Sequence, residues 1–209
     1  MDTDSASLFI HATRLARRDP DAAIALLRDA RSRARALSDA EESAQLGSFL
    51  ASLLKVAGRR EEALEAYLEA EGDNPESFYL KLHLASFLTH VLGRPAEALP
   101  RITAALPALA EAPSSFHDGL SVLGSTLLAL DRPEEAADAF RRMTTSRVLK
   151  PLPAVACDFW LVTELTEKHL LPEECRAYLA AIVRKAEDEG NAGIREHALR
   201  VLSKIPDGS

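Results

Sequence analysis

A short turn sequence recurs five times along this chain, and each copy ends in a small residue. The copy at residues 58–63 (GRREEA) shows the pattern, in which a turn and acidic residues precede a small residue that opens a helix. The small residues are Ala23, Ala63, Ala98, Ala136 and Cys175, at intervals of 40, 35, 38 and 39 residues. A unit that repeats at this period predicts a stack of helix–turn–helix pairs.

Each copy carries the chemistry of a helix end followed by a helix start. Gly58 and Gly93 can adopt the left-handed conformation in which helices commonly end. Four copies have a proline in the first helical turn, where no N–H group is needed: Pro20, Pro95, Pro133 and Pro172. Acidic residues follow at the positive end of the helix dipole, and each contributes roughly 0.3–1 kcal/mol. A larger apolar residue comes four positions after each small one and is expected to fill the groove between two helices: Leu27, Tyr67, Ile102, Phe140 and Leu179.

Composition supports an all-α fold. Ala and Leu dominate, aromatic residues make up 5% of the chain, and runs of β-branched residues are absent. The net charge of −7 argues against binding to a nucleic-acid backbone. Residues 1–60 carry 10 Lys and Arg against 8 Asp and Glu, whereas residues 61–209 carry 15 against 24. The arginines near 14–18 and 28–35 are interpreted as a solvated helix face, with a patch for an anionic ligand as the alternative.

We therefore predict one continuous domain over residues 1–209, an α–α superhelix of about five helix pairs and a C-terminal capping helix. The pairs are expected near 5–37, 38–72, 76–110, 114–145 and 154–189, and the cap near 192–204. In the second helices of these pairs, Arg28, Arg31 and Arg35 are placed outside, and Gly72 is expected to end its helix. Pro100 predicts a bend and Pro107 an early helix end. Residues 147–153 are expected to form an irregular connector.

The repeat resembles the tetratricopeptide repeat (TPR) family. The segment from Ala44 to Ser77 carries the resemblance best, through residues spaced as in that family: Leu50, Ala51, Gly58, Ala63, Tyr67, Ala70 and the closing DNP at 73–75. A second unit repeats the pattern with Leu123, Gly124, Ala136 and Phe140. The resemblance covers about residues 5–188. It departs from the family where the early tryptophan is replaced by Gly47, Leu82 and Leu120, and where spacings above 34 imply longer helices or loops.

The resemblance also implies a binding surface, because in TPR proteins the first helices of successive pairs line a concave groove for a peptide or a partner helix. Ten partner-binding residues are predicted on this basis: Ser48, Ser52, Lys55, His83, Phe87, His90, Ser121, Ser125, Trp160 and Glu164. The spacing of His83, Phe87 and His90 places them on one helix face. Phe87 and Trp160 are the large aromatic residues of the predicted groove, with packing between repeats as the alternative. Because Ser48 and Ser52 replace the Lys and Asn of the dicarboxylate clamp, binding of chaperone tails is not expected.

No catalytic residue, cofactor or metal ion is predicted. His83 and His90 lie two helical turns apart, roughly 10 Å by the helix rise, which is too far to share one ion. The segment 119–124 (GLSVLG) resembles a nucleophile elbow but has one residue too many and lies in a helical pattern. Walker and dinucleotide fingerprints are absent. Cys157 and Cys175 are interpreted as buried small residues rather than as a disulfide or as nucleophiles.

The sequence thus predicts a non-catalytic, cytoplasmic protein-interaction module that binds another protein or a peptide. Its start lacks the apolar run of a signal peptide, and its most apolar run, 121–130, has about half the length of a membrane span. Neither a membrane nor a nucleic acid is therefore an expected partner. A self-associating scaffold, which would be a homo-oligomer, is one alternative. An accessory or regulatory subunit of an enzyme complex is another, and a small enzyme with an unfamiliar site also stays open.

Overall fold

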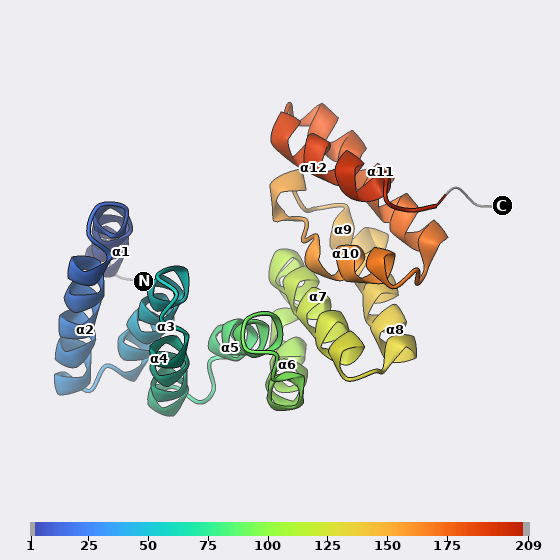
Figure 1. The fold of residues 1–209 in the computed structure, drawn as a ribbon. Helices are drawn as coiled ribbons and strands as arrows, with labels where there is room; N and C mark the ends of the chain where they lie inside the picture. The colour runs from blue at the N-terminus through green and yellow to red at the C-terminus, as the bar shows by residue number, and fades with distance from the viewer. Residues whose placement is uncertain (1–2, 207–209) are drawn as a thin grey trace. The chain divides into compact units, whose positions relative to one another are not determined.

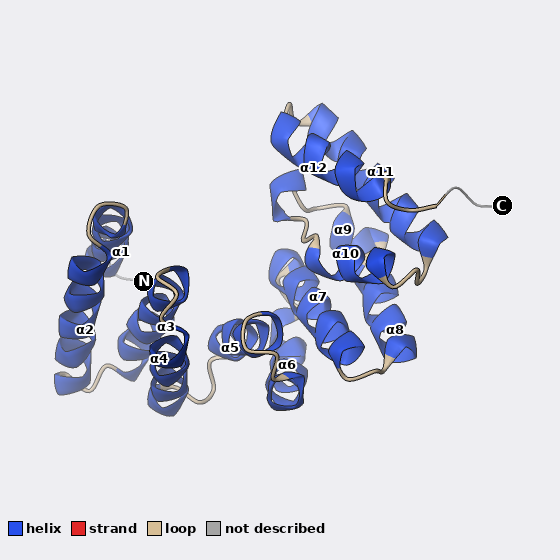
Figure 2. Ribbon diagram, in the orientation of Figure 1, coloured by secondary structure: helices blue, strands red, loops and turns tan. Residues whose placement is uncertain are grey.

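Every regular element in the part of the chain that the computed structural model describes, residues 3–206, is a helix (Figures 1 and 2). The prediction of an all-α fold built from packed helix pairs is confirmed. The helices form two compact units, Met1–Phe87 and Leu88–Ser209, and the boundary falls within one helix, α5 (Phe78–His90). The single continuous domain stays a prediction.

The N-terminal unit consists of two helix pairs and the first part of α5. Its helices are α1 (Thr3–Ala16), α2 (Pro20–Ala36), α3 (Ala40–Val56) and α4 (Arg60–Asp73). Each packs against the next along the chain, so that α3 lies against both α2 and α4. Asp19 and Asp39 cap α2 and α3, where their carboxylates accept hydrogen bonds from the amides of Ala22 and Glu42, each at 2.9 Å.

The C-terminal unit begins with the end of α5 and continues with a further series of helices. These are α6 (Pro95–Leu109), α7 (Pro113–Ala129), α8 (Pro133–Met143), α9 (Ser146–Leu149), the 3₁₀ turn η1 (Ala154–Ala156), α10 (Trp160–Glu167), α11 (Pro172–Asp188) and α12 (Ala192–Leu202). Helix α7 packs against α6, α8 and α10, and α11 packs against α10 and α12. Helix α12 thus covers the last pair, as predicted for a terminal cap.

The recurring small residue is fully buried in every copy of the repeat. Ala23, Ala63, Ala98, Ala136 and Cys175 are all 0% exposed. The larger apolar residue one turn later is equally buried, at 0–2% exposure, in all five copies: Leu27, Tyr67, Ile102, Phe140 and Leu179. The repeat register read from the sequence therefore matches the packing, since a side chain larger than a methyl or thiol would separate the helices.

Five of the helices end with the same hydrogen-bonding pattern. After α3, Gly58 has φ of +76°, and the amides of Gly58 and Arg59 donate to the carbonyls of Lys55 and Leu54 at 3.1 and 2.9 Å. This is the Schellman arrangement that ends many helices. The same pair of bonds follows the helices that end before Ser38, Asp131, His169 and Gly190, and three of these four residues are not glycine. The turn is thus built from the backbone, with glycine at only some copies.

Three local predictions are wrong. Gly72 lies inside α4, which ends at Asp73, and α6 continues past Pro107, where an early end was expected. Helix α6 also runs through Pro100, and the bend expected there stays a prediction. Both prolines are exposed, so the carbonyl groups that they leave without a helical donor can be hydrated. The predicted connector at 147–153 contains the end of α9.

The first helix of the fifth pair also starts later than predicted, at Trp160 instead of residue 154. The Asp158 carboxylate accepts a hydrogen bond from the Trp160 amide at 3.0 Å, and its carbonyl accepts one from the Tyr178 hydroxyl at 2.9 Å. These two bonds fix the chain in a non-helical conformation just before α10.

Replacing each of two glycines in neighbouring helices by alanine is expected to change the free energy of unfolding in opposite directions. A Cβ atom on Gly47 would lie 2.8 Å from the Ala70 Cβ atom, whereas one on Gly72 would meet nothing within 4 Å. We expect Gly47→Ala to lower the free energy of unfolding by about 1–3 kcal/mol through overpacking. The matched variant Gly72→Ala should raise it by about 0.5–1 kcal/mol, because alanine favours the helix. Urea unfolding followed by circular dichroism measures both, and changes of the same sign would contradict the α3–α4 packing.

Candidate partner-binding surfaces

A hollow of about 780 Å³ lies in the N-terminal unit, between α1, α3 and the start of α5. Aromatic side chains form much of its wall. The rings of Phe9 and Phe49 lie 3.9 Å apart between centroids, and those of Phe78 and Tyr79 lie 4.4 Å apart. Phe9 and Tyr79 remain 46% and 47% exposed, so a large apolar surface is accessible to a partner.

Three of the predicted partner-binding residues, Ser48, Ser52 and His83, line this hollow together. The Ser52 hydroxyl donates to the Ser48 carbonyl at 3.1 Å and lies 3.3 Å from the Tyr67 hydroxyl, which places it at the base of the wall. Lys55 is exposed at the C-terminal end of α3. The hollow therefore combines polar side chains on α3 and α5 with an aromatic wall.

Phe87 occupies a different environment, because its side chain is only 2% exposed. Its ring packs against the buried ring of Tyr67, with 5.3 Å between the centroids. Burial raises the pKa of Tyr67, and the hydrogen-bonding contact with Ser52 acts in the opposite direction. The position of Phe87 therefore corresponds to the alternative given above, packing between repeats, and its ring presents no free face to a partner.

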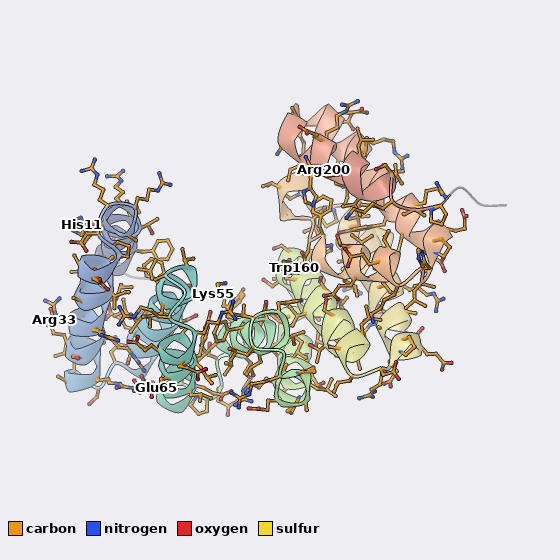
Figure 3. The ribbon with its side chains drawn as sticks, in the orientation of Figure 1. His11, Arg33, Lys55, Glu65, Trp160 and Arg200 are labelled. Carbon is orange, nitrogen blue, oxygen red and sulfur yellow. The ribbon has the colours of Figure 1, made fainter. Side chains whose placement is uncertain are left out.

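In the C-terminal unit the structure brings His90 and Trp160 together. Their rings lie 4.7 Å apart between centroids and are tilted by 32°. Trp160, labelled in Figure 3, projects from the first turn of α10 and is 58% exposed. Glu164 lies one helical turn further along α10. Ser121 and Ser125, which were also predicted to line the groove, lie in α7 and are only 0% and 1% exposed.

A buried polar chain that the sequence did not reveal lies behind this surface. His117 is 0% exposed, and its Nε2 atom lies 3.0 Å from the Tyr178 hydroxyl, which in turn donates to the Asp158 carbonyl. Because Tyr178 donates its one proton to Asp158, His117 must donate to Tyr178 from Nε2. This chain joins α7 and α11 to the segment before α10, and so it holds the start of α10, and with it Trp160, in place.

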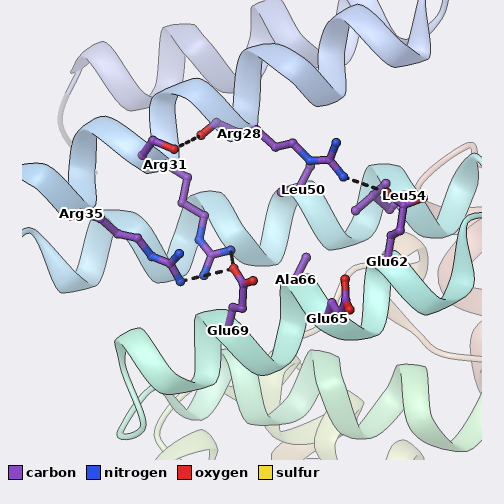
Figure 4. Close-up of a pocket in the computed structure, with 10 residues that line it drawn as sticks. Arg28, Arg31, Arg35, Leu50, Leu54, Glu62, Glu65, Ala66 and Glu69 are labelled. Atoms are coloured by element: carbon purple, nitrogen blue, oxygen red, sulfur yellow. Dashed lines mark hydrogen bonds and ion pairs between the residues drawn. The ribbon is translucent and has the colours of Figure 1, made fainter.

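One arginine of α2 is buried, whereas the side chains of Arg28, Arg33 and Arg35 remain 51%, 66% and 44% exposed, as a solvated face predicts. Arg31 is 4% exposed, and its guanidinium group forms ion pairs with Glu69 and Asp73 of α4, both at 2.7 Å. Figure 4 shows the arginine side chains of α2 directed toward the carboxylates of α4. Arg28 pairs with Glu62 at 2.8 Å and Arg35 with Asp73 at 3.1 Å. The placement of Arg31 outside was therefore wrong, and an anionic ligand would have to compete with the carboxylate contacts that these arginines already make.

Both cysteines are free and buried, as predicted. Burial raises the pKa of the Cys157 and Cys175 thiols to about 11, so both are protonated at neutral pH. Among the described residues, no group of three or more His, Cys, Asp or Glu is arranged to hold a metal ion.

Comparison with solved structures identifies the architecture. The structure of PilW, described as a widely conserved type IV pilus biogenesis factor, superposes with a TM-score of 0.65 at 16% identity, covering 100% of this chain and 97% of that one. PilF of Pseudomonas aeruginosa gives a TM-score of 0.64 at 18% identity, covering 98% and 93%. Kinesin light chain TPR-like repeats from Podospora anserina give 0.61 at 16% identity, covering 98% and 95%. This chain has a TPR-like fold.

The TPR-like fold was therefore predicted correctly from the repeat pattern. No family model matches the sequence, and no match is found among curated proteins. Within the fold, α1, α3, α5, α7 and α10 are the first helices of their pairs, and both surfaces described above lie on these helices. Within residues 3–206, no helix has the length and apolar character needed to cross a membrane.

Proposed function

We propose that this TPR-like protein is a non-catalytic protein-interaction module, and that the hollow of its N-terminal unit binds a peptide or a helix of a partner. The observation that carries the proposal is the aromatic wall of that hollow. Phe9 and Tyr79 leave roughly half of their side-chain surface exposed, although both belong to otherwise packed helices. Large aromatic side chains in a concave surface are the residues that dominate binding energy at protein interfaces.

Polar groups beside the aromatic wall give the hollow a means of orienting its occupant. Gln45, Ser48 and His83 lie on its lining, from α3 and α5. A peptide that covers Phe9 and Tyr79 would bury apolar surface, and its backbone or side chains would form hydrogen bonds with these polar groups. The hollow is about 780 Å³, which is within the range of sites that enclose several side chains.

The proposal is tested by selecting peptides from a phage-displayed random library on the full chain. We expect the selected peptides to lose at least about 30-fold in affinity for the double variant Phe9→Ala/Tyr79→Ala, because truncating two interface anchors costs about 2 kcal/mol or more. The matched control is Leu37→Ala/Val56→Ala, which removes apolar side chains that are 80% and 83% exposed and do not line the hollow. This control should bind the peptides unchanged.

Equal loss in both double variants, or no selected peptide that depends on Phe9 and Tyr79, would overturn the proposal. Sedimentation analysis of the wild-type chain and of Phe9→Ala/Tyr79→Ala separates the self-association alternative. If a second copy of the chain occupies the hollow, the wild type is a dimer and the double variant a monomer. If the occupant is another protein, both have the same mass.

A further inference from the structure

The first helices of the last two pairs, α7 and α10, carry acidic residues but no Lys or Arg. Neither α7 nor α10 contains a Lys or Arg residue, whereas Asp118 lies in α7, and Glu164 and Glu167 lie in α10. Glu167 has a partner, because Lys204 approaches it at 4.0 Å. No ion pair or hydrogen bond involves the Glu164 carboxylate within the described residues. The two packed helices thus contain acidic residues but no Lys or Arg. The buried His117 lies 3.5 Å from the Asp118 carboxylate, and Lys168 follows directly after α10.

Glu164 also keeps a buried oxygen without a hydrogen-bond donor. Its Oε2 atom is buried and unpartnered, and so are the hydroxyl oxygens of Ser121 and Ser125, which lie one turn apart on α7. Helices α7 and α10 are in direct contact, because Leu161 packs against Gly124. A buried carboxylate oxygen that lacks a donor is costly, and more so than a neutral polar atom. The Glu164 carboxylate thus keeps hydrogen-bonding capacity that the described residues do not use.

Trp160 supplies the second element of a cation site. It lies one helical turn before Glu164, on the same face of α10, and its indole is 58% exposed. One side of the ring is packed by His90, which reaches it from α5. An exposed indole attracts a cation over its face, and Trp is the best of the aromatic side chains in this role. A cation seated on Trp160 could reach the carboxylate of Glu164.

We infer that Trp160 and Glu164 form a site for the cationic side chain of a basic partner segment, a lysine or arginine. The ammonium or guanidinium group donates to the Glu164 carboxylate, and its aliphatic stem lies on the Trp160 ring. Asp118 adds negative charge on the neighbouring helix, at 53% side-chain exposure. The site shares no residue with the hollow of the N-terminal unit, so its failure and the failure of the proposed function are separate results.

The test uses the full chain and the fluorescence of Trp160, which is the single tryptophan of the sequence. Hexalysine is expected to change this fluorescence saturably at low ionic strength, whereas hexaglutamate and a neutral glycine–serine hexapeptide should not. Glu164→Gln keeps the shape of the side chain and removes its charge, and it should weaken hexalysine binding about tenfold. Glu173→Gln is the matched control, because it removes the same charge from an exposed position in α11 and should change affinity less than about twofold.

Trp160→Leu provides a second variant whose exposed position does not endanger folding. The affinity of Trp160→Leu for hexalysine, measured by calorimetry, should be several-fold lower than that of the wild type. The inference is overturned if hexalysine leaves the fluorescence unchanged, or if the neutral peptide binds equally well. Equal weakening by Glu164→Gln and Glu173→Gln would show that only net charge attracts the peptide, and unchanged binding to Trp160→Leu would exclude the indole from the site.

Discussion

Replacing Arg31 by methionine should lower the free energy of unfolding of the N-terminal unit by about 3 kcal/mol. The Arg31 side chain is 5% exposed and pairs with the side chains of Asp73 and Glu69, which are 17% and 55% exposed. Removing its guanidinium group leaves the partly buried Asp73 carboxylate with weaker compensation, while methionine preserves most of the side-chain volume. Urea unfolding followed by circular dichroism should show the loss.

Arg33→Met is the control for this prediction. Arg33 lies two positions further along α2, is 66% exposed, and pairs with Asp29 one turn away at 3.1 Å. Such a surface pair contributes little, so the variant should change stability by less than about 0.5 kcal/mol. The double variant Arg31→Met/Asp73→Asn should recover part of the loss, because it removes the uncompensated charge. Equal effects of Arg31→Met and Arg33→Met would contradict a buried ion pair.

The same ion-pair network predicts that the N-terminal unit loses stability at low pH, when Asp73 becomes protonated. Burial alone would raise the pKa of Asp73, but hydrogen bonds from Ser43, Arg35 and Arg31 outweigh it and hold the pKa below its usual value of 3.8. A carboxyl group with a depressed folded-state pKa stabilises the fold above its unfolded-state pKa, about 3.9. That stabilisation is lost as pH falls through the lower folded-state value. In Arg31→Met the pKa of Asp73 should be depressed less, since one of the stabilising donors is gone, so the loss of stability should be smaller and should be complete at a higher pH.

Arg31 also shows where sequence reasoning fails. A helical pattern assigns polar residues to the solvent side, and Arg31 falls on that side of α2. Arg31 is buried instead because it pairs with the carboxylate of Asp73, which is 42 positions away in the sequence. The position of Asp73 depends on how α4 packs. Gly47 is explained by the same crossing, since a side chain there would meet Ala70 and the Arg31 guanidinium. Neither contact has a signature within one helix.

The repeat itself was predictable because its signal is local and occurs five times. A proline or glycine in the turn, acidic residues in the first helical turn and a small residue all act within one unit. The aromatic wall of the N-terminal hollow was not predicted, although Phe9 and Ile10 are adjacent apolar residues that cannot both face the core of one helix, and both remain about half exposed. That local conflict was the available signal. The partner-binding set itself stays a prediction.

The variants Phe87→Ala and Trp160→Ala are expected to differ in unfolding free energy, because Phe87 lies in the core and Trp160 on the surface. Both were predicted to line the groove, because spacing places a residue around the helix axis but gives no information about its depth. Phe87→Ala removes a ring that is 2% exposed and packed on Tyr67, and it should cost about 3–5 kcal/mol in unfolding free energy through lost transfer energy and a cavity. Trp160→Ala removes a ring that is 58% exposed, and it should cost less than about 1 kcal/mol.

Circular dichroism during urea unfolding measures both variants, since it does not depend on the tryptophan. Phe87→Leu serves as the control for volume, because leucine refills part of the cavity and should recover more than half of the loss. For hexalysine binding, the substitution at Trp160 should have the larger effect. Trp160→Ala should weaken hexalysine binding while its circular dichroism spectrum is unchanged, whereas Phe87→Leu should bind hexalysine as the wild type does. If Phe87→Ala were as stable as the wild type, the Tyr67–Phe87 contact that joins α4 to α5 would not exist in solution, and Phe87 would return to the set of candidate partner-binding residues.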